Sequence, residues 1–240
     1  MTAKAKRGYL PGDERDFGEE SLKKLRRAAE EMYYLLDRGY PADSTARFIG
    51  DHYILSERQR LALARTVSAG KNIISRKNRE VSDIRGKTIF IDGFNVIISL
   101  EIAYCESMLF TCMDGSVRDL AGLHGTYRLI PQTDLAVKAM LSTLGRQGIE
   151  KAVVCLDKPI SNSGRLKQRI YELAESVGIP FELEAVTENA VDAILKTKPL
   201  IASGDAAILD KCTEWFGLVR KTIAENIGDY PYTDISPEKI

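Results

Sequence analysis

The sequence predicts an α/β fold, with a doubly wound, mainly parallel sheet flanked by helices and preceded by a small all-α helical domain. From Lys87 onward, short apolar runs alternate with helix-like segments, which implies parallel strands joined by right-handed crossovers. Before Lys87 the apolar residues follow a helical period only. We therefore expect a helical domain with a basic linker in residues 1–80 and an α/β domain in residues 81–240.

The N-terminal part predicts three short helices. Apolar residues recur at spacings of three and four from Leu22 to Leu36, as on one face of an amphipathic helix. Pro41 ends that helix, because proline disfavours a helical conformation in the residue before it. Ser56 and Gln59 form a capping-box pattern at the start of the third helix. The expected helices are 22–36, 42–53 and 56–67, with a loose arm at 1–17 and an irregular linker at 70–86.

The α/β part predicts four strands that alternate with helices. The expected strands are 88–92, 151–156, 181–185 and 199–203, with a further short strand at 216–219. The expected helices are 95–106, 133–147, 165–177, 189–196 and 206–213. Residues 107–130 are the irregular part, with a strand or hairpin arm over 108–113 and a turn at Asp114-Gly115.

The net charge of the 240 residues is zero, but the charge is unevenly distributed. Residues 1–86 hold 18 Lys and Arg against 13 Asp and Glu, so the rest of the chain has the opposite excess. A basic segment joined to an acidic one is consistent with a nucleic-acid-binding surface beside a metal site. The basic residues are also explained as the solvated face of a helix. The candidate phosphate contacts there are Arg58, Arg60, Arg65, Arg76, Lys77 and Arg79.

Composition excludes several other classes. The four cysteines contain no Cys-x-x-Cys pair and the chain has two histidines, so we expect reduced thiols and no zinc site. No run of 18 apolar residues predicts a transmembrane helix, and the N-terminus has no apolar segment typical of a signal peptide. The expected location is cytoplasmic, without a membrane partner, and homo-oligomers remain open.

Three strands are expected to end in aspartate. Asp92, Asp157 and Asp205 each follow a short apolar run, and Asp192 lies in a helix between the last two strands. The carboxyl ends of parallel strands meet at one edge of a sheet, where open α/β folds bind ligands. Like charges held close repel, and a hard divalent cation, Mg²⁺ or Mn²⁺, would relieve that repulsion. Asp92, Asp192 and Asp205 are therefore candidate metal ligands.

Polar residues near these aspartates predict substrate contacts. Asn95 follows Asp92 by three residues and is placed to orient that carboxylate, a water or a phosphate. Asp157 heads a loop of small and polar residues before a helix, and Ser203 precedes the turn to Asp205. Helix starts offer backbone N–H groups to anions. The candidate catalytic residues are Asp92, Asn95, Asp157, Asp192 and Asp205. The candidate substrate contacts are Lys158, Ser161, Ser163, His124, Arg128 and Ser203.

The motif Ile91-Asp-Gly-Phe-Asn-Val-Ile97 resembles the opening motif of the PIN-like superfamily, particularly its NYN branch. The segments 190–195 and 201–209 look like its second and third acidic segments, so the resemblance covers about 87–225. It implies metal-dependent hydrolysis of RNA phosphodiesters, with roles for Asp92, Asn95, Asp192 and Asp205. The chain departs from the family pattern in two places: many PIN domains carry an acidic residue on a helix well after the first Asp, whereas Glu101 follows Asp92 by only nine residues, and residues 107–130 have no counterpart. The whole chain resembles a prokaryotic family of unknown function that joins a helical domain to a PIN-like one.

The sequence leaves a second class open. The protein could be an RNA-binding or regulatory module with a feeble acidic site, since strong RNA binders are usually basic and this chain is near neutral. A phosphotransferase also places Asp at strand ends, but Asp92 is followed by Gly-Phe-Asn, without a second Asp two residues on. The chain also lacks both Gly-rich nucleotide-binding motifs.

Overall fold

The computed structural model describes residues 6–122 and 125–237. The chain divides into two compact units that are discontinuous in sequence. Among the described residues, the α/β unit comprises 6–7, 79–107 and 121–230, and the helical unit comprises 8–78, 108–120 and 231–237. The sequence predicts a single boundary near residue 80, whereas the chain returns to the helical unit twice after that point.

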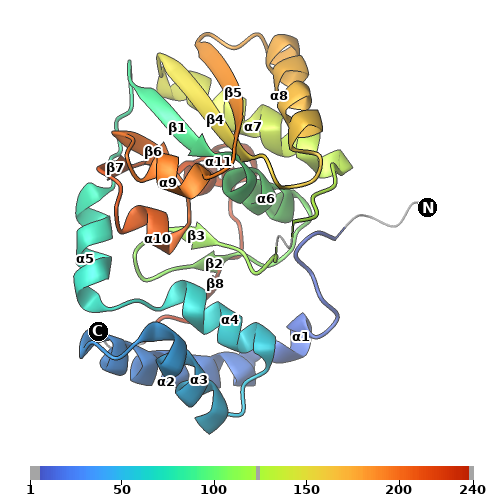
Figure 1. The fold of residues 1–240 in the computed structure, drawn as a ribbon. Helices are drawn as coiled ribbons and strands as arrows, with labels where there is room; N and C mark the ends of the chain where they lie inside the picture. The colour runs from blue at the N-terminus through green and yellow to red at the C-terminus, as the bar shows by residue number, and fades with distance from the viewer. Residues whose placement is uncertain (1–5, 123–124, 238–240) are drawn as a thin grey trace. The chain divides into compact units, whose positions relative to one another are not determined.

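The α/β unit is built on a five-stranded parallel sheet (Figure 1). The strand order is β5-β4-β1-β6-β7, so the chain winds outward from β1 in one direction and then in the other. The expected central position of the strand from 88, between those from 151 and 199, is confirmed. The strands are β1 (Thr88–Asp92), β4 (Lys151–Asp157), β5 (Glu182–Glu188), β6 (Leu200–Ala202) and β7 (Glu214–Trp215). The helices are α6 (Gly93–Tyr104), α7 (Pro131–Gln147), α8 (Ser163–Val177), α9 (Val191–Leu195), α10 (Ala206–Leu209) and α11 (Leu218–Asn226).

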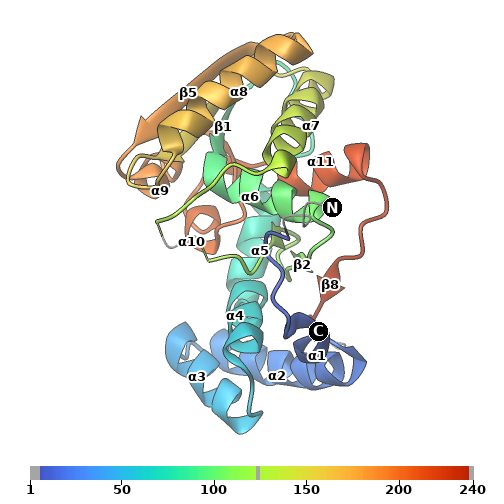
Figure 2. The same cartoon turned by 90° about the vertical axis from the view of Figure 1, so that its right-hand side faces the viewer.

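Helices cover both faces of this sheet. Successive strand residues point to opposite faces. On one face, α6 packs on β1 and β4, and α7 and α11 pack on α6 (Figure 2). On the other face, Phe90, Val153 and Ile201 share an apolar cluster with residues of α9 and α10. The inner strands β4, β1 and β6 are therefore largely buried on both faces, as their continuous apolar runs require.

Gly93 allows α6 to begin directly at the end of β1. A Cβ atom there would lie 2.6 Å from Leu156 and 2.8 Å from the carbonyl oxygen of Cys155. Backbone cannot give way as a flexible side chain can, so glycine fits this position best. The close approach places Asp92 at the N-cap of α6.

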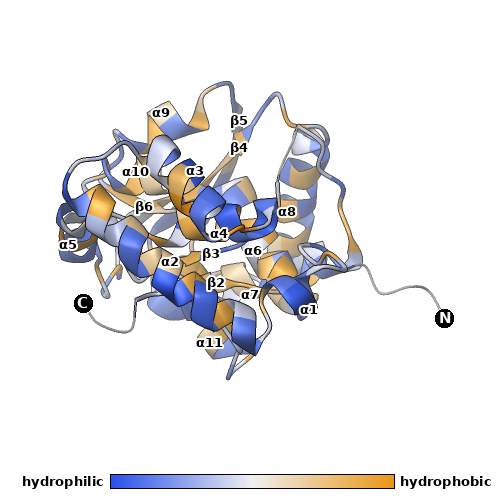
Figure 3. Ribbon diagram, turned by 90° about the horizontal axis from the view of Figure 1, so that it is seen from below, coloured by the Kyte–Doolittle hydropathy of each residue, from blue (hydrophilic) through white to orange (hydrophobic). Residues whose placement is uncertain are grey.

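The helical unit consists of helices and a small three-stranded sheet of order β3-β2-β8. Figure 3 shows that hydrophilic and hydrophobic residues alternate along α2 and α3. Their apolar faces bury Leu25, Met32 and Ile49, which pack in one core with Phe110 of β2 and with Ile235. The elements are α1 (Asp13–Asp16), α2 (Glu19–Asp37), α3 (Ala42–His52), α4 (Glu57–Thr66), α5 (Gly70–Arg79), β2 (Phe110–Thr111), β3 (Val117–Arg118) and β8 (Thr233–Asp234).

Three local expectations differ from the structure. Residues 70–79 form helix α5 rather than a linker, and residues 13–16 of the expected loose arm form α1. The short strand expected near 216–219 lies two residues earlier as β7, and Leu218 and Val219 instead begin α11. A four-residue apolar run does not distinguish a strand from a buried helix start. Helix α5 buries Ile73 and Arg76, but most of its residues are polar, so the sequence shows no clear apolar face there.

A buried ion cluster holds the β2–β3 turn within the helical unit. Asp114 accepts hydrogen bonds from Arg76 at 2.8 Å and Arg118 at 2.6 Å, and all three side chains are buried. Burial alone would raise the pKa of Asp114, but the Arg118 charge and the hydrogen bonds from Ser116 and Arg76 lower it to about 2. Charge pairing therefore overcomes desolvation here.

The remaining general expectations concern cysteines and membranes. The four cysteines are free and buried, as expected. Among the described residues, no helix combines the length and the apolar character needed to cross a membrane.

Candidate functional site

The register of the sheet brings Asp92, Asp157 and Ser203 to the α9 face. Each residue lies two positions beyond a strand residue of the apolar cluster on that face, namely Phe90, Cys155 and Ile201. Side chains two residues apart along a strand point the same way. β1 pairs in parallel with β4 and with β6, so the carboxyl ends of all three strands share one edge. We call this set of groups, with Asp192 and Asp205, the acidic edge.

Asp92 is the buried centre of the acidic edge. Its side chain accepts a hydrogen bond of 2.8 Å from the Ser203 hydroxyl, and the residue is 6% exposed. Burial raises the pKa of Asp92 to about 7; the charges of Asp192 and Asp205 add to this rise, and the Ser203 hydrogen bond opposes it. A buried carboxyl group near two other carboxylates is a common feature of functional sites.

The turn from β6 to α10 is fixed by side chains of the same edge. Asn95 accepts a 2.7 Å hydrogen bond from the Gly204 N–H, and the Ser203 hydroxyl accepts one of 3.0 Å from the Asp205 N–H. Asp205 caps α10, because its Oδ1 accepts from the N–H groups of Ala207 and Ile208. The Asn95 side chain thus supports the Asp205 turn, and the Asn95 backbone N–H bonds the Asp92 carboxylate.

Asp192 and Asp157 complete the set. Asp192 lies in the first turn of α9, which packs on β1 and β4, and its side chain is exposed. Burial raises the pKa of Asp157, the Asp192 charge raises it further, and a hydrogen bond from the Val191 N–H opposes both. Asp192 therefore interacts electrostatically with both Asp92 and Asp157.

The four aspartates have no salt-bridge partner in the described part of the chain: no Lys or Arg there pairs with Asp92, Asp157, Asp192 or Asp205. The described part of the chain also has no group of three His, Cys, Asp or Glu side chains placed to hold an ion together. Magnesium needs fewer, since it binds through one or two carboxylates and keeps several waters. Carboxylate oxygens such as those of Asp92 are the hard donors that this ion takes.

Some candidate substrate contacts have exposed side chains, and others are hydrogen-bonded within the protein. Lys158 and Arg128 have exposed side chains. Ser161 is committed to Tyr127, whose N–H it accepts at 3.0 Å and to whose carbonyl it donates. Ser163 is buried and bonds the Lys158 carbonyl at 3.4 Å. His124 lies outside the described residues.

Sequence reasoning missed a buried network around Glu101. Glu101 is fully buried, accepts hydrogen bonds from Tyr127 at 2.6 Å and from Thr133, and pairs with Arg7 at 2.8 Å. Arg7 also lies over the Tyr127 ring, 4.7 Å from its centroid. Burial raises the pKa of Glu101, against the Arg7 charge and the two hydrogen bonds. No local signal reveals this network, because Arg7 and Glu101 are far apart in sequence.

Glu101 is not placed to join the acidic edge. It lies nine residues after Asp92 along α6, which corresponds to about 13 Å of helix. Its network instead holds the Tyr127 side chain, and the side chains of Ser161 and Asn162 form hydrogen bonds with the Tyr127 backbone. Glu101 therefore supports the loop that follows Asp157 rather than supplying a ligand.

The arginines expected to contact phosphate are mostly used inside the protein. Arg58 pairs with Asp13 at 2.7 Å, and Arg60 with Asp51 at 2.8 Å. The remaining partners are Asp119 for Arg65, Asp114 for Arg76 and the Leu209 carbonyl for Arg79. Lys77 is exposed. Neither a recognition helix nor a solvated face describes this pattern, because these guanidinium groups bind the protein's own acids and carbonyls.

Comparison with known proteins places the chain among proteins without an assigned activity. Residues 81–221 match the model of a domain of unknown function, DUF5616, and residues 24–79 match that of a protein of unknown function, DUF434. The chain is 36% identical over 187 residues to the uncharacterized protein MJ0935 of Methanocaldococcus jannaschii, covering 77% of this chain and 88% of the relative. No solved structure is significantly similar.

Proposed function

The chain belongs to the DUF5616 family, and from the site itself we propose that it is a metal-dependent ribonuclease that hydrolyses RNA phosphodiesters at the acidic edge. The observation that carries this proposal is the buried Asp92 beside two further carboxylates, with none of which a described Lys or Arg forms a salt bridge. The PIN-like resemblance of the 91–97 motif supports RNA as the substrate class.

Each residue of the acidic edge has its own role in the proposed reaction. Asp92 and Asp205 would hold Mg²⁺ or Mn²⁺, with waters as the remaining ligands and the charge of Asp192 nearby, and the bound ion would activate water and offset charge on the phosphate. Ser203 orients the Asp92 carboxylate through its 2.8 Å hydrogen bond. Asn95 fixes the turn that carries Asp205. Asp157 and the exposed Lys158 and Arg128 would contact the substrate strand.

A cleavage assay on single-stranded RNA and DNA of one sequence tests the proposal. We expect RNA cleavage with Mn²⁺ or Mg²⁺ and none in chelator. Asp92→Asn and Asp205→Asn should lower the rate at least about 100-fold, because a bound ion supplies several kcal/mol of charge stabilisation. Asp229→Asn is the matched control, since Asp229 is an exposed aspartate of the same unit. Cleavage that survives both substitutions would contradict the proposal.

A second function is favoured by one observation. The described residues hold no group of three acids placed around one ion, which suits a catalytically weak RNA-binding or regulatory module. Such a module would bind the same RNA without cleaving it, with an affinity that falls as salt rises. Binding without cleavage across both metals would select this alternative.

A further inference from the structure

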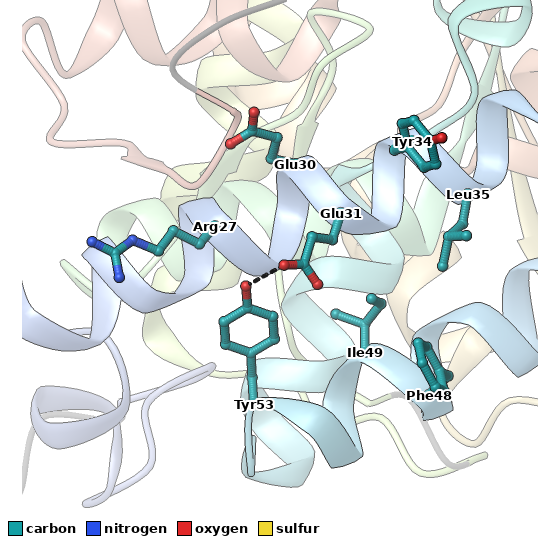
Figure 4. A pocket seen from close by; sticks show the side chains of 8 residues that line it. All are labelled: Arg27, Glu30, Glu31, Tyr34, Leu35, Phe48, Ile49 and Tyr53. Atoms are coloured by element: carbon teal, nitrogen blue, oxygen red, sulfur yellow. Dashed lines mark hydrogen bonds between the residues drawn. The ribbon is translucent and has the colours of Figure 1, made fainter.

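The helical unit has a pocket on its surface between α2 and α3 (Figure 4). Its volume is about 560 Å³, within the range of small-molecule sites. The residues that line it are Arg27, Glu30, Glu31, Tyr34, Leu35, Phe48, Ile49 and Tyr53. It lies entirely within residues 27–53 and shares no residue with the acidic edge.

Aromatic rings at this pocket are exposed where a core would bury them. Phe48 is 64% exposed and Tyr34 is 54% exposed, while Ile49 beside them is buried. The Arg38 guanidinium lies over the Tyr34 ring, 3.4 Å from its centroid, so a ring of this surface already accepts a cation. Phe48 has no such partner among the described residues. An exposed ring beside an apolar floor provides a place for the alkyl part of a ligand.

Two carboxylates of the pocket have no ionic partner. Within the described part of the chain, no Lys or Arg forms a salt bridge with Glu30 or Glu31. Arg27 precedes them by three and four residues, the spacing of helical ion pairs, yet Figure 4 shows its guanidinium turned away from both. The Tyr53 hydroxyl donates to one oxygen of Glu31 at 2.7 Å, which holds that carboxylate toward the pocket.

We propose that this pocket binds a linear aliphatic polyamine, with one ammonium group on Glu31, a second on Glu30, and the methylene chain against Phe48 and Ile49. Charge complementarity selects this occupant. Arg38 lies over the Tyr34 ring and Arg27 is turned away from both carboxylates, so among the described residues the unpaired charge beside the apolar floor is that of Glu31, which attracts a cation. Figure 4 shows Glu31 directed toward Tyr53 and Glu30 directed to the other side of α2, so a chain that reaches both carboxylates crosses α2.

Calorimetric titration of the full chain with 1,4-diaminobutane and with spermidine tests the site, with 1,4-butanediol as the neutral probe. We expect saturable binding of the amines and none of the diol. Glu31→Gln should weaken binding about tenfold or more, because it removes a charge but keeps the acceptor for Tyr53. Phe48→Ala should weaken it about threefold. Glu57→Gln, which changes an exposed glutamate of α4, is the matched control and should change nothing.

Four outcomes would overturn the proposal. They are the absence of saturable amine binding, equal binding of the diol, unchanged affinity in both Glu31→Gln and Phe48→Ala, and tighter binding of a blocked lysine amide than of the diamine. The last result would assign the pocket to a lysine side chain of a partner protein instead. Thermal melting followed by circular dichroism is the folding control. We expect both variants to melt like the parent, because both substituted side chains are exposed.

Discussion

Asp92 in the α/β unit and Asp114 in the helical unit are both almost fully buried, at 6% and 1% exposure, yet their chemistry differs. Burial raises the pKa of Asp92 to about 7, whereas the charge of Arg118 and hydrogen bonds from Ser116 and Arg76 outweigh burial and lower the pKa of Asp114 to about 2. The neighbours of a buried carboxyl group therefore decide whether it stays ionised at low pH, as Asp114 does, or retains a proton up to near neutral pH, as Asp92 does.

The largest expected effect comes from Asp114→Asn. The substitution leaves Arg76 and Arg118 buried without their shared carboxylate, and breaking a buried ion cluster costs about 3–5 kcal/mol. Urea unfolding at pH 7 measures the loss. The parent should also lose stability as pH falls from about 4 to 2, because the folded pKa lies below the unfolded one. A loss below about 1 kcal/mol would show that the ion pairs of Asp114 do not stabilise the fold appreciably.

Arg7→Met should convert Glu101 from a paired acid into an unpaired one. The buried carboxylate would keep its hydrogen bonds from Tyr127 and Thr133 but lose its counter-charge. We expect a loss of about 3 kcal/mol in chemical unfolding. The double variant Arg7→Met with Glu101→Gln should recover much of this loss, because no uncompensated charge remains. An additive double variant would show that the ion pair contributes little.

Manganese should stabilise the parent protein through the acidic edge. Binding to the folded state contributes about 2.7 kcal/mol at a hundredfold excess over Kd. For a chain of this size the melting temperature should rise by several degrees. Asp92→Asn and Asp205→Asn should lose the rise, and Asp229→Asn should keep it. An equal rise in all four proteins would place the ion elsewhere.

In chelator, Asp92→Asn should be as stable as the parent or more stable. The folded pKa of Asp92 is about 7 and its unfolded value is 3.8, so the folded state retains a proton between these values. The stability of the parent therefore falls as pH rises from about 4 to 7, and linkage limits this fall to about 4 kcal/mol. We expect a gain of about 2 kcal/mol for the variant at pH 8 and none at pH 4. A variant that is less stable at pH 8 would make Asp92 a structural acceptor.

The sheet could be predicted because its signals are local. The apolar run before Asp92 and the glycine after it mark a strand that turns directly into a helix, and the structure has both. The two-residue strands β2, β3 and β8 carry too few residues for a periodic signal. Helix α5 was hidden because its buried Arg76 depends on Asp114, 38 residues later.

The acidic edge could be predicted in part. Strand ends give Asp92 and Asp157, and the alternation along each strand explains why Ser203 meets Asp92. The preference of Asn95 for the Gly204 N–H, and the pairing of Arg7 with Glu101, depend on tertiary contacts across about 100 residues. Residue spacing in a single sequence does not reveal partners that are so far apart along the chain.

The helical unit begins near residue 8 but is completed by Ile235, which lies in its core with Leu25 and Met32. During synthesis α2 leaves the ribosome roughly 10–40 seconds before β8, at about 5–20 residues per second. In that interval the apolar faces of the first helices lack Phe110, Leu120 and Ile235, and Arg76 lacks Asp114 until the β2–β3 turn emerges. A segment translated much later therefore completes the core of the first helices, and a fragment cut near residue 80 would lack part of its own core.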